Sequence, residues 1–263
     1  MAKDGKLGGF RLGNRWRFPL KAIEELIQAS GKPEIAVKSA NLIKDSKPKP
    51  QRRIIKKNPN AYNMGFTSMA LALPESITIA ETYLDLQDWK LTRAKVLEEN
   101  LLQKNAQSTS VSFFKVIRQR LQKMNDAQLQ TLVSVDFQQQ AMLLYANICK
   151  IHRFIYEFVV EILRSKILNL DYQIQEAEYR SFIDQKVLEH PEIEDLSKRS
   201  SAKVKQVMFR VLAEAGLIKS TSDWTLTPFI VPPQISQLVG QDTPALLKAF
   251  LMSDNDIRRA TEA

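Results

Sequence analysis

The sequence predicts a mainly α-helical protein, a multi-helix bundle that ends in a winged helix-turn-helix with a small β-hairpin wing. Long segments of the 263-residue chain carry apolar residues at helical spacing, the primary signal for amphipathic helices. Only 8 glycines and 11 prolines are available to interrupt them. Near the C-terminus a glycine ends the last strongly amphipathic helix, and two strand-like pieces around a polar turn follow it.

Residues 1–60 are expected to form a basic N-terminal extension with two short helices and a linker. They contain 15 Lys and Arg against 5 Asp and Glu, whereas the rest of the chain contains 23 against 24. Apolar spacing favours helices over residues 18–30 and 33–45, and the prolines and mutually repelling charges of residues 46–60 favour a solvated linker. Basic blocks at one end of a chain commonly bind nucleic acid. The candidate contacts to the DNA backbone are Arg52, Arg53, Lys56 and Lys57; the alternative is a tail without a specific partner.

Residues 61–170 are expected to form a helical core domain. Helical spacing covers about 74–86, 88–100 and 110–124, and a short helix follows the candidate N-cap Asn125. The longest helix runs from about 136 to 166 and is apolar around most of its circumference, so it should lie at the centre of the domain. The candidate N-caps of the helix at 110–124 are Ser108, Thr109 and Ser110.

Residues 110–135 are a candidate second helix-turn-helix element within this domain. The alternative is an ordinary pair of amphipathic helices whose outer side chains are only solvated. The basic side chains that would face DNA in the first arrangement are Lys115, Arg118, Arg120 and Lys123.

Residues 171–245 are expected to form the winged helix-turn-helix domain, followed by a C-terminal tail at 246–263. A helix ends before Pro191, a short helix covers about 192–196, and a turn leads to a second helix capped by Ser200 or Ser201. Gly216 suits the left-handed position just past that helix. The buried stripe of the second helix follows the helical period and comprises Val204, Val207, Met208, Val211, Leu212 and Ala215.

The outer face of this second helix is the main candidate for DNA contact. In a winged helix it would lie in the major groove, while the wing touches the neighbouring backbone. Basic and hydroxyl side chains at a helix N-terminus suit phosphate, because free N–H groups and the helix dipole favour an anion there. On the helix, Gln206 suits adenine and Arg210 suits guanine. The candidate residues are Lys198, Arg199 and Ser200 at the N-terminal end, with Lys198 and Arg199 in the turn, and Lys203, Gln206 and Arg210 along the helix.

The sequence argues against an enzyme, a metal site or a bound cofactor. Cys149 is the only cysteine, and the only histidines are His152 and His190, so neither an intrachain disulfide nor a cysteine-based zinc site can form. There is no glycine-rich phosphate loop, G-x-S-x-G or H-E-x-x-H motif.

The most apolar segment, residues 141–163, carries several charges and is therefore expected to be a buried helix, not a membrane span. A cytoplasmic protein is expected.

Five stretches together resemble the A protein of BREX phage-defence systems, the BrxA family. They are YNMGFTSMALALPES at 62–76, the segment from Trp89 to Lys104, the serine-rich entry to VIRQRL, the helix ending in EFVVEILRSKI, and SSAKVKQVMFRVLAEAGLI. The resemblance runs from about 62 to 239 and leaves the basic extension outside. It implies a small, mostly helical, non-enzymatic protein that binds double-stranded DNA. It also implies partners among other BREX proteins: a methyltransferase, an ATPase and a phosphatase-like subunit. The alternatives are a protein-interaction scaffold within the defence complex and a transcriptional repressor.

Overall fold

The computed structural model describes residues 10–12, 15–17 and 60–262. The chain divides into two compact units, Met1–Asn58 and Pro59–Ala263. In the first unit, strands β1 (Phe10–Leu12) and β2 (Arg15–Arg17) pair antiparallel, with Arg11 opposite Trp16. The helices expected over 18–30 and 33–45, and the candidate DNA contacts Arg52, Arg53, Lys56 and Lys57, lie outside the described residues.

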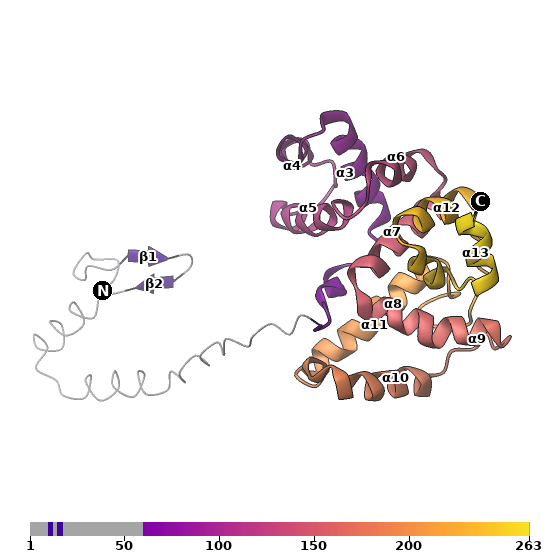
Figure 1. Ribbon diagram of the computed structural model, residues 1–263. Helices are drawn as coiled ribbons and strands as arrows, with labels where there is room; N and C mark the ends of the chain where they lie inside the picture. Colours follow the sequence, from indigo (N-terminus) through magenta and orange to yellow (C-terminus); the bar gives the residue numbers. More distant parts are fainter. Residues whose placement is uncertain (1–9, 13–14, 18–59, 263) are drawn as a thin grey trace, which may run out of the picture. The chain divides into compact units, whose positions relative to one another are not determined.

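The second unit is mainly helical, which confirms the predicted fold class at this level (Figure 1). Its first half contains the 3-10 helix η1 (Gly65–Ser68), α3 (Leu73–Leu86), α4 (Trp89–Glu98), α5 (Gln107–Leu121), α6 (Asp126–Ser134) and α7 (Phe137–Ile151). Its second half contains α8 (Arg153–Phe158), the π-helix η2 (Val159–Leu163), α9 (Arg164–Leu168), α10 (Glu176–Glu189), the 3-10 helix η3 (Pro191–Ile193), α11 (Lys198–Glu214), α12 (Pro233–Asp242), the 3-10 helix η4 (Pro244–Phe250) and α13 (Asp254–Glu262).

The central helix is buried as predicted, but the prediction of one continuous helix is wrong. It breaks at His152, whose backbone leaves the helical region with φ −116° and ψ 84°. The His152 Nδ1–H donates to the carbonyl oxygen of Asn63 over 3.0 Å, so the break is held by a distant segment. Burial, with a smaller effect of Arg120, lowers the pKa of His152 to about 4 despite that hydrogen bond, which keeps the ring neutral. His152 is therefore a structural residue.

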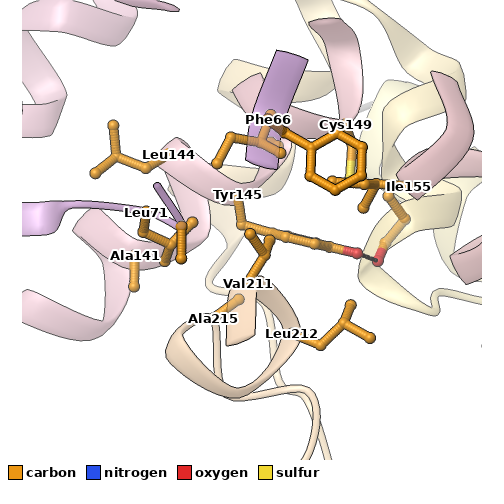
Figure 2. Packing of buried hydrophobic residues seen from close by; sticks show 14 of the residues in the cluster. Phe66, Leu71, Ala141, Leu144, Tyr145, Cys149, Ile155, Val211, Leu212 and Ala215 are labelled. Atoms are coloured by element: carbon orange, nitrogen blue, oxygen red, sulfur yellow. Dashed lines mark hydrogen bonds between the residues drawn. The ribbon is translucent and has the colours of Figure 1, made fainter. Parts of the chain in front are cut away.

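One hydrophobic core joins segments that lie far apart in the sequence. Tyr145 of α7 lies among Phe66 of η1 and Val211 and Leu212 of α11 (Figure 2). The Tyr145 hydroxyl donates to the carbonyl oxygen of Ala249 in η4 over 2.9 Å. The core continues from Tyr62 to Leu251, so part of the segment expected as a tail is buried. The expected division of this unit at residue 170 stays a prediction.

Two of the predicted N-caps are wrong, and one is confirmed. α5 begins at Gln107 after Ala106, before the serines and threonine at 108–110 that were expected to cap it. Asn125 does cap α6, because its side chain accepts from the Gln128 N–H at 2.9 Å and the Gln128 side chain bonds back. Each of the two side chains thus accepts from the backbone N–H of the other residue, which satisfies two N–H groups at the start of α6.

The start of α11 also differs from the prediction. Its N-cap is Ser197, whose Oγ accepts from the Ser200 N–H over 3.1 Å, and not Ser200 or Ser201. Lys198 and Arg199 consequently lie in the first turn of α11 and not in the preceding turn. The helix expected at 192–196 is only the short 3-10 helix η3.

The expected β-hairpin wing is not confirmed, because no strand forms between residues 60 and 262. The segment after α11 instead contains isolated bridges, Ile218 with Leu226 and Thr225 with Gln173. The Lys219 N–H donates to the Thr225 carbonyl over 3.0 Å, so the chain does turn back on itself. Gly216 has φ +82°, as predicted for a residue just past a helix.

In the part of the chain that the structure describes, none of the helices is long and apolar enough to cross a membrane.

Candidate nucleic-acid interface

Helix α11 separates an apolar face from a polar face, as its sequence predicts. The whole predicted stripe is buried, and Phe209 joins it at 2% exposure. On the opposite face, Lys203, Gln206 and Arg210 are exposed. The buried face therefore fixes the helix in the core and leaves these three side chains toward solvent.

The N-terminal end of α11 presents cations that have no acidic partner in the described part of the chain. Lys198, Arg199 and Ser200 are all exposed. The Ser200 Oγ lies 2.9 Å from the Ser197 Oγ, and the Ser200 N–H is used by the cap. Among the residues that the structure describes, neither the Lys198 side chain nor the Arg199 side chain has a hydrogen bond or an ion pair. Both charges are available to an external anion.

Farther along α11, the charges are partly paired. The Lys203 Nζ donates to the Gln206 Oε1 over 3.1 Å, an interaction that leaves the lysine charge uncompensated. The Arg210 Nε lies 3.7 Å from the Glu214 Oε1, with both side chains well exposed. The other oxygen of Glu214 accepts from the Leu71 N–H over 2.8 Å. The positive charge of the face therefore weakens toward its C-terminal end.

A hollow of about 320 Å³ lies beside the N-terminal half of α11. Thr67 and Met64 form one side of it, and three of the candidate residues form the other. Two cationic side chains around a concave surface raise the local concentration of anions. The lining residues are Met64, Thr67, Leu196, Arg199, Ser200, Lys203 and Val204.

Lys205 is a basic residue of α11 that does not belong to this face. Its Nζ bonds Glu176 of α10 and lies 4.8 Å from the ring centroid of Trp224. Trp224 in turn stacks on Phe209 with ring centroids 3.8 Å apart. Lys205 therefore ties α10, α11 and the segment after α11 together, and its contribution is structural.

The second candidate element, residues 110–135, loses one of its four basic residues. Arg120 is 5% exposed, and its guanidinium donates to the carbonyl oxygens of Ala70 at 2.5 Å and Met69 at 2.9 Å. Burial lowers the pKa of Arg120 to about 10, against an opposing effect of Glu214. Arg120 is thus a buried support for the 69–70 backbone, and the prediction that it faces DNA is wrong.

The sequence contains a signal that would have placed Arg120 correctly. It stands three residues after Ile117 and next to Leu121, two positions that are 0% exposed. That spacing puts the arginine on the buried face of α5.

Of the three remaining basic residues of this element, Lys115 and Arg118 lie on α5, and Lys123 is exposed just past its end. Lys115 is exposed and Arg118 is half-buried. Helix α5 packs against α3, α4 and α7. No group of three His, Cys, Asp or Glu side chains placed to hold a metal ion occurs among the residues described.

Comparison with known proteins points to one family. The family model BrxA matches residues 60–242. A protein of Bacillus cereus strain H3081.97, "BREX protein BrxA", is 23% identical over 128 residues, which are 49% of this chain and 64% of that relative. The chain thus matches less than two thirds of the relative's length. The basic extension lies outside the family match, as the resemblance of the sequence motifs predicted.

The fold also occurs in a solved structure. The crystal structure of an uncharacterized protein from Magnetospirillum magneticum superposes with a TM-score of 0.63 at 18% sequence identity. The superposition covers 72% of this chain and 97% of the other. At this identity the likeness shows a shared fold.

Proposed function

Because the chain belongs to the BrxA family and is therefore a BREX defence-system component, we propose that it binds double-stranded DNA as a cytoplasmic, non-enzymatic accessory protein of that system. Binding is mainly to the phosphate backbone. The observation that carries the proposal is the exposed cationic face of α11, with Lys198, Arg199 and Lys203 free of acidic partners among the described residues.

The proposed docking uses α11 as the helix that enters the major groove. Its buried stripe holds it rigidly, so side chains on the outer face keep a fixed spacing. Gln206 and Arg210 then reach base edges, and Lys198, Arg199 and Ser200 contact phosphate. The turn at 220–223 takes the place of a wing and touches the adjacent backbone, although it lacks paired strands.

Two further sets of residues extend the proposal. Lys115 and Arg118 on α5 form a smaller second contact with DNA. The arm residues Arg52, Arg53, Lys56 and Lys57 add phosphate contacts of their own, because a dense run of cations displaces condensed counterions from DNA.

Simultaneous substitution of Lys203, Gln206 and Arg210 by Ala tests the assignment. We expect affinity for a DNA duplex to fall at least tenfold at low salt. The slope of log affinity against log salt should shrink by about 0.9 for each phosphate whose charge Lys203 or Arg210 neutralises in the parent. Gel-shift titrations of the full chain at several salt concentrations measure both quantities.

The matched control is Lys90→Ala with Arg93→Ala, which removes the same charge from the exposed surface of α4. It should change the affinity little. If the triple variant binds like the parent, α11 is not the interface. If the parent binds with no salt dependence, or fails to bind at low salt, the phosphate-backbone mechanism is wrong.

The repressor alternative makes a different prediction. A repressor would protect one preferred sequence upstream of its own genes in footprinting. A backbone-binding accessory protein would show only a weak preference, because phosphate contacts carry no sequence information and only Gln206 and Arg210 reach base edges.

A further inference from the structure

Exposed apolar side chains gather beside the C-terminal end of α9. Leu168 is 49% exposed, Leu170 75%, Tyr172 42% and Ile230 82%. Three of them line a groove of about 550 Å³. Soluble proteins that expose several large apolar side chains around one concave surface commonly use it for binding. The residues that form this α9 groove include Leu168, Tyr172, Phe229, Ile230 and Met252.

Leu170 stands in the turn next to this groove in an unfavourable backbone conformation. Its φ is +59°, in the left-handed region that branched side chains disfavour. The turn is held in place because the Asp171 N–H donates to the Lys166 carbonyl over 2.9 Å and the Asp171 carboxylate accepts from the Lys166 Nζ over 2.5 Å. The fold therefore keeps a strained turn that presents leucine to solvent, where glycine or asparagine would be easier to accommodate.

The charge around the α9 groove is acidic on its outer side. Asp171 is 56% exposed whereas its partner Lys166 is 8% exposed, and Asp254 is 71% exposed whereas its partner Arg164 is 11% exposed. In both pairs the cation is buried and the carboxylate faces solvent. Asp256 is the only charged side chain among the described residues that line the groove. Arg259, 3.9 Å away from it, offsets part of that charge.

We propose that the α9 groove docks a segment of a partner protein that carries apolar side chains flanked by Lys or Arg. The apolar lining supplies contact area, and the outward carboxylates attract the basic flanks. DNA is a poor occupant because the groove is apolar and its exposed carboxylates repel phosphate.

This docking surface is separate from the α11 face, and it extends the proposed function to partner recruitment. The α9 groove and the α11 face consist of different residues, so loss of partner docking can be measured separately from loss of DNA binding. A groove variant that still binds DNA but no longer binds the partner segment supports the assignment of DNA binding to the α11 face and of partner docking to the α9 groove.

An array of overlapping peptides from the other proteins encoded in the same BREX gene cluster tests the proposal. The probe is the labelled full-length chain, compared with Leu170→Asp/Ile230→Asp. Both substituted positions are largely exposed, so the variant should fold. We expect the parent to bind at least one segment rich in apolar residues and Lys or Arg. The variant should bind that segment at least tenfold more weakly and bind DNA like the parent.

Leu188→Asp is the matched control, because Leu188 is 85% exposed and lies outside the α9 groove. It should leave peptide binding unchanged. Asp171→Asn with Asp254→Asn should weaken binding several-fold at low salt and have little effect at high salt. The proposal is overturned if no segment binds, if the bound segments are acidic, or if Leu170→Asp/Ile230→Asp binds the segment like the parent. A parent dimer in sedimentation that Leu170→Asp/Ile230→Asp converts to monomer would also overturn it in favour of a second copy.

Discussion

Glu157 is the residue at which three distant parts of the chain meet. Its carboxylate accepts from the Tyr62 hydroxyl at 2.5 Å, the Arg153 Nε at 2.8 Å and the Lys186 Nζ at 2.6 Å. Lys186 also pairs with Glu161 at 2.6 Å. The helical spacing of Glu157 and Glu161 thus brings the two carboxylates to one shared lysine.

The pKa of Glu157 follows from these contacts. Burial acts to raise it, but hydrogen bonds from Lys186 and Tyr62 and the charges of Lys186 and Arg153 hold it below its usual value of 4.5. In the unfolded chain the pKa returns to that value. The contribution of Glu157 to folding is therefore present above pH 4.5 and is lost as the pH falls through the lower pKa of the folded state.

Glu157→Gln is expected to lower the free energy of unfolding by about 1–3 kcal/mol at neutral pH, because buried donors lose a charged acceptor. The difference from the parent should shrink as the pH falls below 4.5. Urea denaturation of both chains over a pH series measures this. Glu161→Gln, with one partner and 41% exposure, is the control and should cost less. A pH-independent difference between Glu157→Gln and the parent would contradict the explanation.

At the scale of the element, the N-terminal end of α11 has carboxylates close to the cations that are proposed to contact DNA. Exposed Glu194 and Asp195 stand three and two residues before its cap Ser197, close in sequence to the cations Lys198 and Arg199. A carboxylate near a phosphate contact opposes binding by like-charge repulsion. Within the proposed function, these two residues limit the affinity of the interface.

Glu194→Gln with Asp195→Asn is accordingly expected to strengthen DNA binding about three- to tenfold at low salt, with the effect fading at high salt. Fluorescence anisotropy of a labelled duplex measures the affinity. Asp85→Asn with Glu81→Gln, two exposed acidic positions on α3, is the control for total charge. An equal gain in both variants would mean that net charge, and not the position of α11, governs binding.

Helices were the elements that the sequence predicted best, because their signal is local. The apolar stripe of α11 and the capping box of α6 depend on residues within a few turns of each other. The break at His152 could not be predicted in this way, since it depends on Asn63, 89 positions earlier in the chain. The apolar periodicity continues across residues 136–166 and therefore indicated one uninterrupted helix.

The prediction of a wing was not confirmed and the prediction that Arg120 faces DNA was wrong, for different reasons. Strand-like patterning after Gly216 predicted a hairpin, but Leu226 and Thr225 bond partly to residues 172–173 instead. Such a non-local partner is invisible in the segment itself. Arg120 was misplaced because its charge was weighed more heavily than its position on the buried face of α5.

At the scale of the whole molecule, the shared core predicts how residues 60–262 unfold. Phe250, 1% exposed, lies 6.1 Å from the Tyr145 ring and 5.8 Å from the Phe229 ring between centroids. It therefore connects the C-terminal segment to α7, more than a hundred positions earlier in the chain. One cooperative unit is expected.

Phe250→Ala should lower the free energy of unfolding by about 3–5 kcal/mol, through lost burial and the cavity left behind. The most protected amides of α3 and those of α11 should exchange hydrogen faster by the same factor as each other, because both helices unfold together. Leu188→Ala, at an exposed site, is the control. Acceleration in α11 alone would instead support two domains divided near residue 170.

Cys149 has a practical consequence for experiments on this molecule. Its thiol is 3% exposed, and burial raises its pKa to about 12, so it is neither accessible nor ionised at neutral pH. It is also the only cysteine in the chain. A cysteine introduced at an exposed position such as Gln206 or Ile230 would be the sole reactive thiol. Fluorophores, spin labels or disulfide tethers to modified DNA can therefore be attached at one chosen site without first replacing Cys149.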